Sequence, residues 1–448
     1  MLLLPTLVLL TTVTSVVSSL GAPLVPAIAV EAGVSFSDAQ WTLTAALLSG
    51  AVATPVAGRL GGNRRRRAVI IGGLVVVAVG TLLAALPLGF SFLLAGRAMQ
   101  GVGMALTPLA FAVAREFVED SQPAIALLSV TTIVGAGLGY PVTAVVAEHF
   151  GIHAAFWLGL AICLVTLSLA VTSVPRSTST AVDRVDWLGA GLLASGTASF
   201  LVAISQGDPW GWTSGRVLAL VLFAVVTLVL WVRRTLRVEH PLVDLRLARS
   251  GGAVAANLTA LTGGIATYLL LSIVMIQVQA PTTDGFGLGR SVTVAGLLLV
   301  PYSLLSFTGS RVTTSLSRWI TPDFILPIGA AVFASAIAGL AVWHTEVWQV
   351  AVVMAVAGVG SGCTFAALPG LIVRSVPAEE TGSATAFNHV MRMLGFSTGS
   401  ALALALLEVF SVGGAMTDSS YAAVAWVGSA IWAGTGAVTL GLALRRIS

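Results

Sequence analysis

Charge is scarce in this sequence, and lysine is missing altogether. Only 9% of the 448 residues are charged, and all 22 basic residues are arginine. Soluble domains carry about 25% charged residues, so this composition excludes an ordinary soluble fold. Hydrophobic residues make up 57% of the chain, and the mean hydropathy is +0.99. We conclude that the chain is an integral membrane protein.

Cysteine and clustered metal-binding side chains are also scarce. Cys163 and Cys363 lie far apart in apolar runs, and no metal-ligand spacing surrounds them. We therefore expect both cysteines to be packing residues and expect no metal site. The sequence contains no G-x-x-x-x-G-K-[ST] loop, so an ion gradient rather than ATP is the expected driving force. The apolar runs hold no clusters of His, Asp or Glu, so we expect neither a cofactor nor an enzymatic activity.

Apolar runs of about 20 residues recur along the whole chain, the length that an α-helix needs to cross a bilayer. The pattern predicts an all-α polytopic membrane protein with fourteen transmembrane helices. The first run has no basic leader and is too long for a signal peptide, so we expect it to be retained. The expected spans are 5–30, 40–60, 68–88, 91–114, 123–147, 153–174, 187–205, 216–232, 253–279, 292–313, 323–343, 347–373, 382–409 and 421–444.

The arginines predict the orientation of the chain in the membrane. With fourteen spans both termini lie on one side, and 18 of the 22 arginines then fall on that side, against two on the other and two within spans. Because cytoplasmic loops are enriched in arginine, we expect both termini in the cytoplasm of a plasma (inner) membrane. The net charge of +4 reflects this topology, so we expect the lipid bilayer and no nucleic acid as partner.

A weak internal similarity predicts two halves. "QGVGMALTPLAFAVARE" in the fourth span is similar to "AGVGSGCTFAALPGLIVRS" in the twelfth, and an acidic stretch follows each. Many secondary transporters are built from repeated halves with a site between them. We expect a six-helix half over 1–175, an inserted helix pair with its linkers over 176–250, and a second six-helix half over 251–448.

Four motifs resemble those of a known family. "GRLGGNRRRR" (58–67) resembles the cytoplasmic loop signature of the major facilitator superfamily, although Gly62 stands where the family has an aspartate. "LLAGRAMQGVGMA" (93–105), "GAGLGYP" (135–141) and "AQWTLTAALLSGAVATPVAGRL" (39–60) are similar to helices of its fourteen-helix drug:proton antiporter branch. The resemblance implies gating or packing roles for Gly58, Arg65, Arg66, Gly101, Gly135, Gly139 and Pro141. For the loop, topology anchoring alone is the alternative, and for the glycines ordinary helix packing.

Two arginines inside spans are candidates for the transport pathway. A charged side chain in hydrocarbon costs roughly 2.5 to 3.5 kcal/mol, so Arg97 needs a polar cavity or a fixed partner. Gln100 shares its helix face, and we expect Arg97 to act on an outer carboxylate such as Glu31; snorkelling to the surface is the alternative. Asn388, His389 and Arg392 form a second polar group, with ligand-free inter-helix bonding as the alternative.

Proton carriers and cavity-lining groups complete the candidates. Glu31, Asp38, Glu148 and Glu408 lie at outer helix ends, where each is either a proton carrier or a solvated rim charge, and His389 is a further titratable candidate. No acidic residue lies at mid-span. The aromatic and amide groups that we expect to line a cavity are Trp41, Tyr140, Tyr268, Gln277, Gln279 and Tyr302.

These features predict a monomeric exporter of small hydrophobic or amphipathic, drug-like compounds in exchange for protons, working by alternating access. A facilitator or symporter for an endogenous metabolite is the first alternative. A non-transporting membrane sensor is the second, from another class, but a sensor would normally carry a soluble output domain, and the loops are too short for one.

Overall fold

The computed structural model describes residues 2–61, 65–119, 121–176, 185–239, 241–242, 245–246, 251–316, 319–375, 381–411 and 416–444. The secondary structure over these residues is helical. Within the expected first six spans lie α1 (Leu3–Ser19), α2 (Val25–Ala32), α3 (Phe36–Leu60), α4 (Arg66–Ala85), α5 (Phe90–Gly101), α6 (Leu106–Phe117), α7 (Ser121–Phe150) and α8 (Ile152–Ser173). They are followed by α9 (Trp187–Ser205), α10 (Gly207–Trp210), α11 (Gly215–Thr235), α12 (Gly251–Gln279), α13 (Val292–Leu316), α14 (Pro322–Val342), α15 (Val347–Val373), α16 (Thr381–Val409) and α17 (Asp418–Leu444).

Each expected span coincides with one helix or with consecutive helices. Eleven helices of the described residues are long and apolar enough to cross a membrane. The chain therefore has the composition of a polytopic helical membrane protein, and the full count of fourteen transmembrane helices remains a prediction.

Two expected spans are not single helices. The first is broken by a 3-10 turn, η1 (Ala22–Leu24), because Gly21 precedes it and Pro23 and Pro26 lie at the starts of η1 and α2. The fourth is divided by η2 (Val102–Ala105), which follows Gly101. Glycine weakens a helix, so the glycine-rich sequence of this span lets the backbone tighten there.

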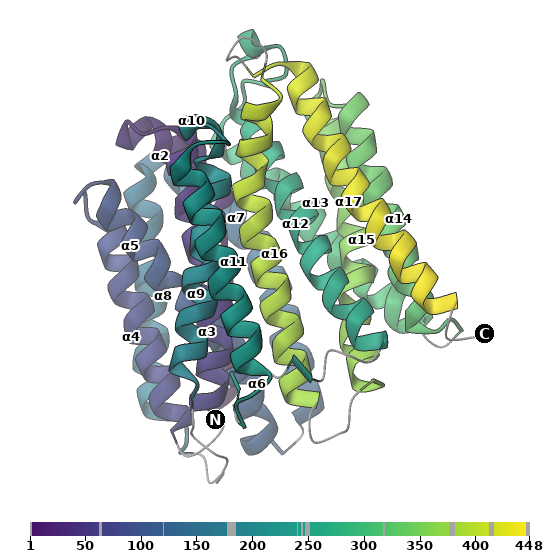
Figure 1. Ribbon diagram of the computed structural model, residues 1–448. Helices are drawn as coiled ribbons and strands as arrows, with labels where there is room; N and C mark the ends of the chain where they lie inside the picture. The colour runs from purple at the N-terminus through teal and green to yellow at the C-terminus, as the bar shows by residue number, and fades with distance from the viewer. Residues whose placement is uncertain are drawn as a thin grey trace.

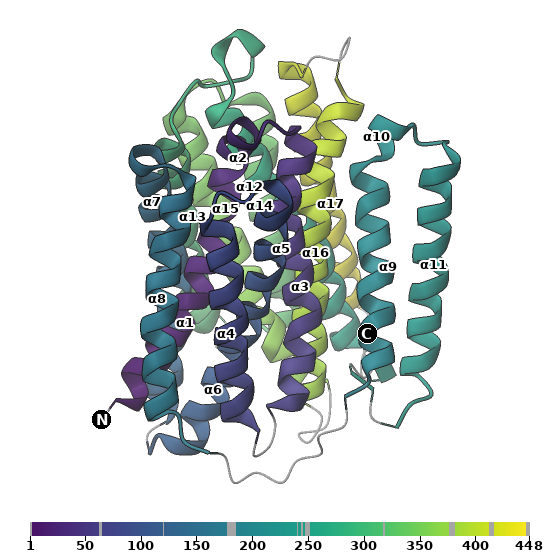
Figure 2. The same cartoon turned by 90° about the vertical axis from the view of Figure 1, so that its left-hand side faces the viewer.

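The helices form two bundles and a peripheral pair (Figures 1 and 2). We call α1–α8 the first bundle, α12–α17 the second bundle, and α9 with α11 the peripheral pair. The pair lies at one side of the molecule, where α9 contacts both α3 and α16. Asp186 holds the pair together, because its carboxylate accepts a hydrogen bond from Gly189 N at the start of α9 and forms an ion pair with Arg234 of α11 at 2.8 Å.

The two ends of the molecule differ in how the bundles meet. We call the end at which α1 begins and α17 ends the terminal end, and the end that carries α2, α10 and residues 280–291 the distal end (Figure 1). At the distal end one apolar core joins both bundles, with Leu24 and Leu43 packed in the same cluster as Leu269 and Ile273. At the terminal end each bundle has its own main core: Ile70, Leu106 and Val113 belong to the first, and Ala260, Ile325 and Leu368 to the second. A smaller cluster at the peripheral pair, which includes Leu193 and Phe387, also has Val52 of α3 packed against it.

Candidate functional site

Arg97 lies in the interior of the first bundle and is only 1% exposed. Its Nε donates to the Thr42 carbonyl of α3 at 3.0 Å, and its Nη1 donates to Gln100 Oε1 at 2.5 Å. Gln100 is itself buried and donates through Nε2 to Thr81 Oγ1 of α4 at 3.1 Å. The expected pairing of Arg97 with Gln100 is therefore confirmed. The arginine is fixed in the bundle by partners on α3 and α5, so it does not snorkel.

Three of the four tyrosines of the sequence gather where the bundles meet. Tyr140 of α7, Tyr268 of α12 and Tyr302 of α13 lie close enough to interact electrostatically with one another. Tyr268 and Tyr140 also interact electrostatically with Arg97. Tyr268 also interacts with Arg392 of α16. We call Arg97, Tyr140, Tyr268, Tyr302, His389 and Arg392 the central cluster; both bundles contribute to it.

Arg392 and His389 form the part of this cluster that belongs to α16. Arg392 Nη2 lies 2.9 Å from His389 Nδ1, and the guanidinium carbon lies 5.7 Å from the centre of the Phe365 ring. Both side chains are only partly buried, although each lies several turns inside a helix of 29 residues. Arg392 Nε and His389 Nε2 have no hydrogen-bond partner among the described residues.

An aromatic wall lies beside Arg392 in the second bundle. Tyr268 packs on Phe396 with ring centres 4.5 Å apart, and Phe365 contacts both Phe396 and Trp432, at 6.2 and 6.3 Å. The central cluster and the adjoining wall therefore combine two cationic groups and phenolic hydroxyls with aromatic rings, of which Phe365 and Phe396 are partly exposed.

Besides Gln100, which bonds to Arg97, and Gln279, which donates to the Pro23 carbonyl at 3.2 Å, three expected pathway residues lie outside the central cluster. Trp41 donates through Nε1 to Ser205 Oγ of α9 at 3.0 Å, so it faces the peripheral pair. Asn388 donates to Ala256 O and Asn257 Oδ1 of α12 at 2.9 and 3.1 Å. Its role in the structure is inter-helix bonding, which was the alternative interpretation of its sequence position.

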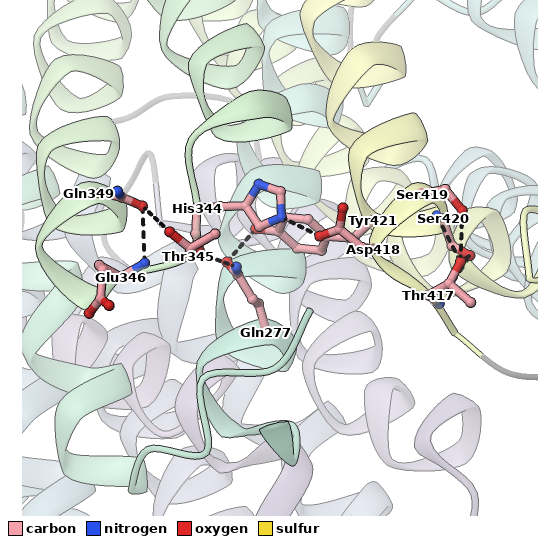
Figure 3. Close-up of polar contacts among 10 residues, drawn as sticks. All are labelled: Gln277, His344, Thr345, Glu346, Gln349, Thr417, Asp418, Ser419, Ser420 and Tyr421. Carbon is pink, nitrogen blue, oxygen red and sulfur yellow. Dashed lines mark hydrogen bonds and ion pairs between the residues drawn. The ribbon is translucent and has the colours of Figure 1, made fainter. Parts of the chain in front are cut away.

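Gln277 is the third, and it belongs to a polar network at the distal end of the second bundle (Figure 3). Its Nε2 donates to the His344 carbonyl at 2.8 Å, and its Oε1 accepts from the Tyr421 hydroxyl at 2.6 Å. His344 Nε2 in turn lies 2.7 Å from Asp418 Oδ1. We call these four residues the distal clasp, because they tie α12 to the α14–α15 connection and to α17.

The expected proton carriers are distributed over the distal end. Glu31 forms an ion pair with His153 Nε2 of α8 at 3.2 Å, so the pairing of Arg97 with Glu31 is not observed among the described contacts. The two side chains line a pocket of about 310 Å³ with Phe90, Leu93 and Ile152. His153 Nδ1 lies 3.3 Å from the Ala84 carbonyl, so both ring nitrogens of this histidine face oxygen atoms.

The other three carboxylates have different surroundings. Asp38 belongs to the first turn of α3, where its Oδ2 accepts from the Ser35 hydroxyl at 2.7 Å. Glu408 is partly buried, one residue before the end of α16. Glu148 is exposed beyond the expected span 123–147 and accepts from Thr293 N at 2.9 Å. Hydrogen bonding from Thr293 and Ser291 lowers the pKa of Glu148, which favours the ionised form of this carboxylate.

The arginine-rich loop is anchored by an ion pair that the sequence motif does not contain. Arg66 is buried, donates to Gly61 O at 2.8 Å and forms an ion pair with Glu116 of α6. Glu116 thus supplies a carboxylate to a loop whose Gly62, outside the described residues, replaces the family's aspartate. Arg65 is exposed, and a Cβ at Gly58 would meet nothing within 4 Å, so Gly58 is not a close-packing position.

The remaining glycines and the proline lie in closely packed helices. A Cβ at Gly101 would collide with the Ala46 carbonyl of α3, which confirms that this glycine permits close helix packing. Pro141 lies inside α7, where Gly296 of α13 packs against residues 140–144. Gly139 is also in α7 and is partly buried; at Gly135 the structure describes the helix but not the local packing.

A polar seam that the sequence did not predict joins the two bundles. Gln40 of α3 donates to Ser272 Oγ of α12 at 3.1 Å and to the carbonyl and hydroxyl of Ser400 of α16 at 3.0 and 2.9 Å. Thr44 of α3 bonds to Ser397 and Ser400 in the same seam. Small hydroxyl residues are common in membrane helices, so no sequence signal distinguished these.

Comparison with known proteins identifies the family. Residues 7–400 match the model of the Major Facilitator Superfamily, so the chain belongs to this family of membrane transporters. It is 28% identical over 413 residues to an uncharacterized MFS-type transporter of Mycobacterium tuberculosis, covering 89% of this chain and 58% of that protein. The chain thus spans less than two thirds of that relative's length.

A second relative and a solved structure give further similarities. The chain is 26% identical over 386 residues to a multidrug resistance protein B homolog of Mycobacterium tuberculosis, covering 82% of this chain and 68% of that protein. A crystal structure of a peptide transporter in complex with sulfate matches 99% of this chain and 94% of its own, with a TM-score of 0.70 and 15% sequence identity. At this identity the structural match concerns the fold alone.

Proposed function

We propose that this chain is a secondary transporter that exports small hydrophobic or amphipathic compounds in exchange for protons. The observation that carries the proposal is the contrast between the two ends of the molecule. The bundles share one large core at the distal end, whereas their main cores are separate at the terminal end, where a small cluster at the peripheral pair touches both bundles. The central cluster lies between the two ends. A carrier whose two bundles rock about a site near the midplane is expected to have this arrangement when it is open toward one side, here the terminal end.

Two further features support a drug-like cargo. The aromatic wall beside Arg392 offers the apolar surface that amphipathic compounds need. The similarity to a multidrug resistance protein homolog points to the same class of compound. We also propose that the chain acts as a monomer and that its working units are residues 1–175, 176–250 and 251–448.

The orientation is part of the proposal. The excess of arginine on the loops at the terminal end favours a cytoplasmic location for this end and for both termini. A fluorescent reporter that folds only in the cytosol, fused after Ser448, should be bright in intact cells. A fusion protein that is full-length in the membrane but dark would show that both termini lie outside the cytoplasm. The central cluster would then open toward the opposite side of the membrane.

Everted membrane vesicles test the transport reaction directly. Vesicles containing the protein should accumulate dyes and antibiotics from a panel when their interior is acidic, and a protonophore should abolish this accumulation. Vesicles without the protein are the control. Transport that persists without any ion gradient, and only down the substrate gradient, would identify a facilitator; the lack of a mid-span carboxylate favours this second candidate. No movement of any compound would favour the sensor.

A further inference from the structure

We propose that the part of the central cluster around Arg392 binds the anionic group of an amphipathic aromatic compound. The substrates would then be organic anions with a flat apolar body rather than organic cations. The inference rests on the proposed function, since it names the class of compound that the same site takes.

Unpaired hydrogen-bond donors point to an anion. A guanidinium has donors only, so in the 2.9 Å contact with Arg392 Nη2 the His389 Nδ1 accepts. The proton of the neutral ring is then on Nε2. His389 Nε2 and Arg392 Nε are both buried atoms without a partner among the described residues, and both are donors. A buried donor without an acceptor is costly, and oxygens of a bound carboxylate or sulfonate would satisfy both.

No carboxylate of the described residues forms an ion pair with the positive charge of Arg392. None of the ion pairs between described residues includes Arg392, and its neighbours are Tyr268, His389 and Phe365. A second positive charge, Arg97, approaches the same tyrosine from the first bundle. Because Arg97 is held by Thr42 and Gln100, it contributes to the positive potential without a direct contact. In a region of low dielectric this potential attracts anions and repels cations.

The aromatic wall defines the rest of the compound. Tyr268, Phe365, Phe396 and Trp432 form a connected set of ring contacts that begins next to the guanidinium. Tyr268 and Trp432 are buried, whereas Phe365 and Phe396 are partly exposed and provide the accessible apolar surface. An inorganic anion would leave this apolar surface unused. A planar aromatic body would cover it, with the anionic group directed at Arg392 and His389.

Binding of three matched probes to the purified full-length protein in detergent tests this inference. Pyrenebutyrate is an anion, pyrenemethylammonium a cation and pyrenemethanol neutral, and all three share one aromatic body. Energy transfer from tryptophan to pyrene gives each Kd. We expect the anion to bind at least about tenfold more tightly than the cation. Equal binding of all three, or preference for the cation, would overturn the inference, and this comparison on the parent protein requires no variant.

Variants locate the site. Arg392→Gln should weaken pyrenebutyrate binding about tenfold and leave pyrenemethanol nearly unchanged, while Arg392→Lys should keep part of the preference. Arg311→Gln is the matched control, because Arg311 also stacks on a phenylalanine, Phe307 at 4.6 Å, but is exposed. An anion preference that survives Arg392→Gln, or falls equally in Arg311→Gln, would refute the assignment to Arg392.

The binding assay also separates this inference from the proposed function. Anion-selective binding without transport in vesicles would overturn the proposed function and leave the site standing. Proton-driven export of cations by a protein that does not prefer pyrenebutyrate would overturn the anion site and leave the proposed function standing. Displacement of pyrenebutyrate by millimolar sulfate, without displacement by benzoate, would show an inorganic-anion site and refute the aromatic part.

Discussion

Gln40 of α3 donates hydrogen bonds to both the carbonyl and the hydroxyl of Ser400 in α16, so one buried amide joins the two bundles near the distal end. With Thr44, Ser272 and Ser397 it forms a seam across which the bundles must separate if the molecule is to open distally. The distal closure is therefore held by hydrogen bonds as well as by the shared apolar core.

Replacement of Gln40 by alanine should make the distal end open more often. A hydrogen bond contributes about 0.5 to 1.5 kcal/mol net, so loss of the Gln40 bonds should raise the open population about tenfold or more. We would measure the rate at which a thiol reagent labels Ser272→Cys in the purified protein; the native cysteines are buried. Gln349→Ala is the control, because Gln349 bonds within its own bundle. Equal labelling rates in both variants would show that the seam does not hold the closure.

Arg66 should matter more for stability than the adjacent Arg65. Arg66→Gln breaks a partly buried ion pair with Glu116 and the bond to Gly61, which we expect to cost about 1 to 3 kcal/mol. Arg65→Gln, at an exposed position, should cost less than about 0.5 kcal/mol. Melting temperatures in detergent compare the two, and Glu116→Gln should reproduce the loss. If the Arg65→Gln and Arg66→Gln variants have the same melting temperature, the ion pair between Arg66 and Glu116 does not stabilise the protein.

Arg97 should be needed for both stability and transport. Arg97→Ala leaves the Thr42 carbonyl and Gln100 Oε1 without their donor in the bundle interior, so we expect a stability loss of about 1 to 3 kcal/mol. Arg97→Lys keeps the charge but loses the planar fork, and it should melt closer to the parent while transporting poorly. Paired melting and vesicle assays check this. An alanine variant that transports at the parent rate would remove Arg97 from the pathway.

Glu148 should stabilise the protein at neutral pH and lose this effect in acid. Its folded pKa is lowered, with hydrogen bonding from Thr293 as the first cause. The contribution is therefore present above its ordinary pKa of 4.5 and disappears as the pH falls through the lower folded value. Glu148→Gln should melt below the parent at pH 7 and approach it below about pH 4. Glu119→Gln, at an exposed position, is the control and should melt at the same temperature as the parent.

The sequence by itself determined where the helices lie and which charges stand inside them. Hydropathy placed every expected span on a helix or on consecutive helices, because a bilayer imposes one length and one composition on anything that crosses it. The spacing of Arg97 and Gln100 predicted their hydrogen bond, since residues three apart share a helix face. The breaks in the first and fourth spans were less visible, because membrane helices tolerate glycine and proline in most positions.

The tertiary structure alone decided which residues meet across helices. The sequence spacing of Arg97, Tyr268 and Arg392 does not predict that two arginines from different bundles approach one tyrosine. The sequence also does not predict that Glu116 pairs with Arg66. These contacts depend on the packing of helices that are far apart in the sequence, and helical periodicity specifies the face of a residue but not the neighbour it meets. For the same reason Gln277 and Trp41, which look like cavity groups in the sequence, are held by the distal clasp and the peripheral pair.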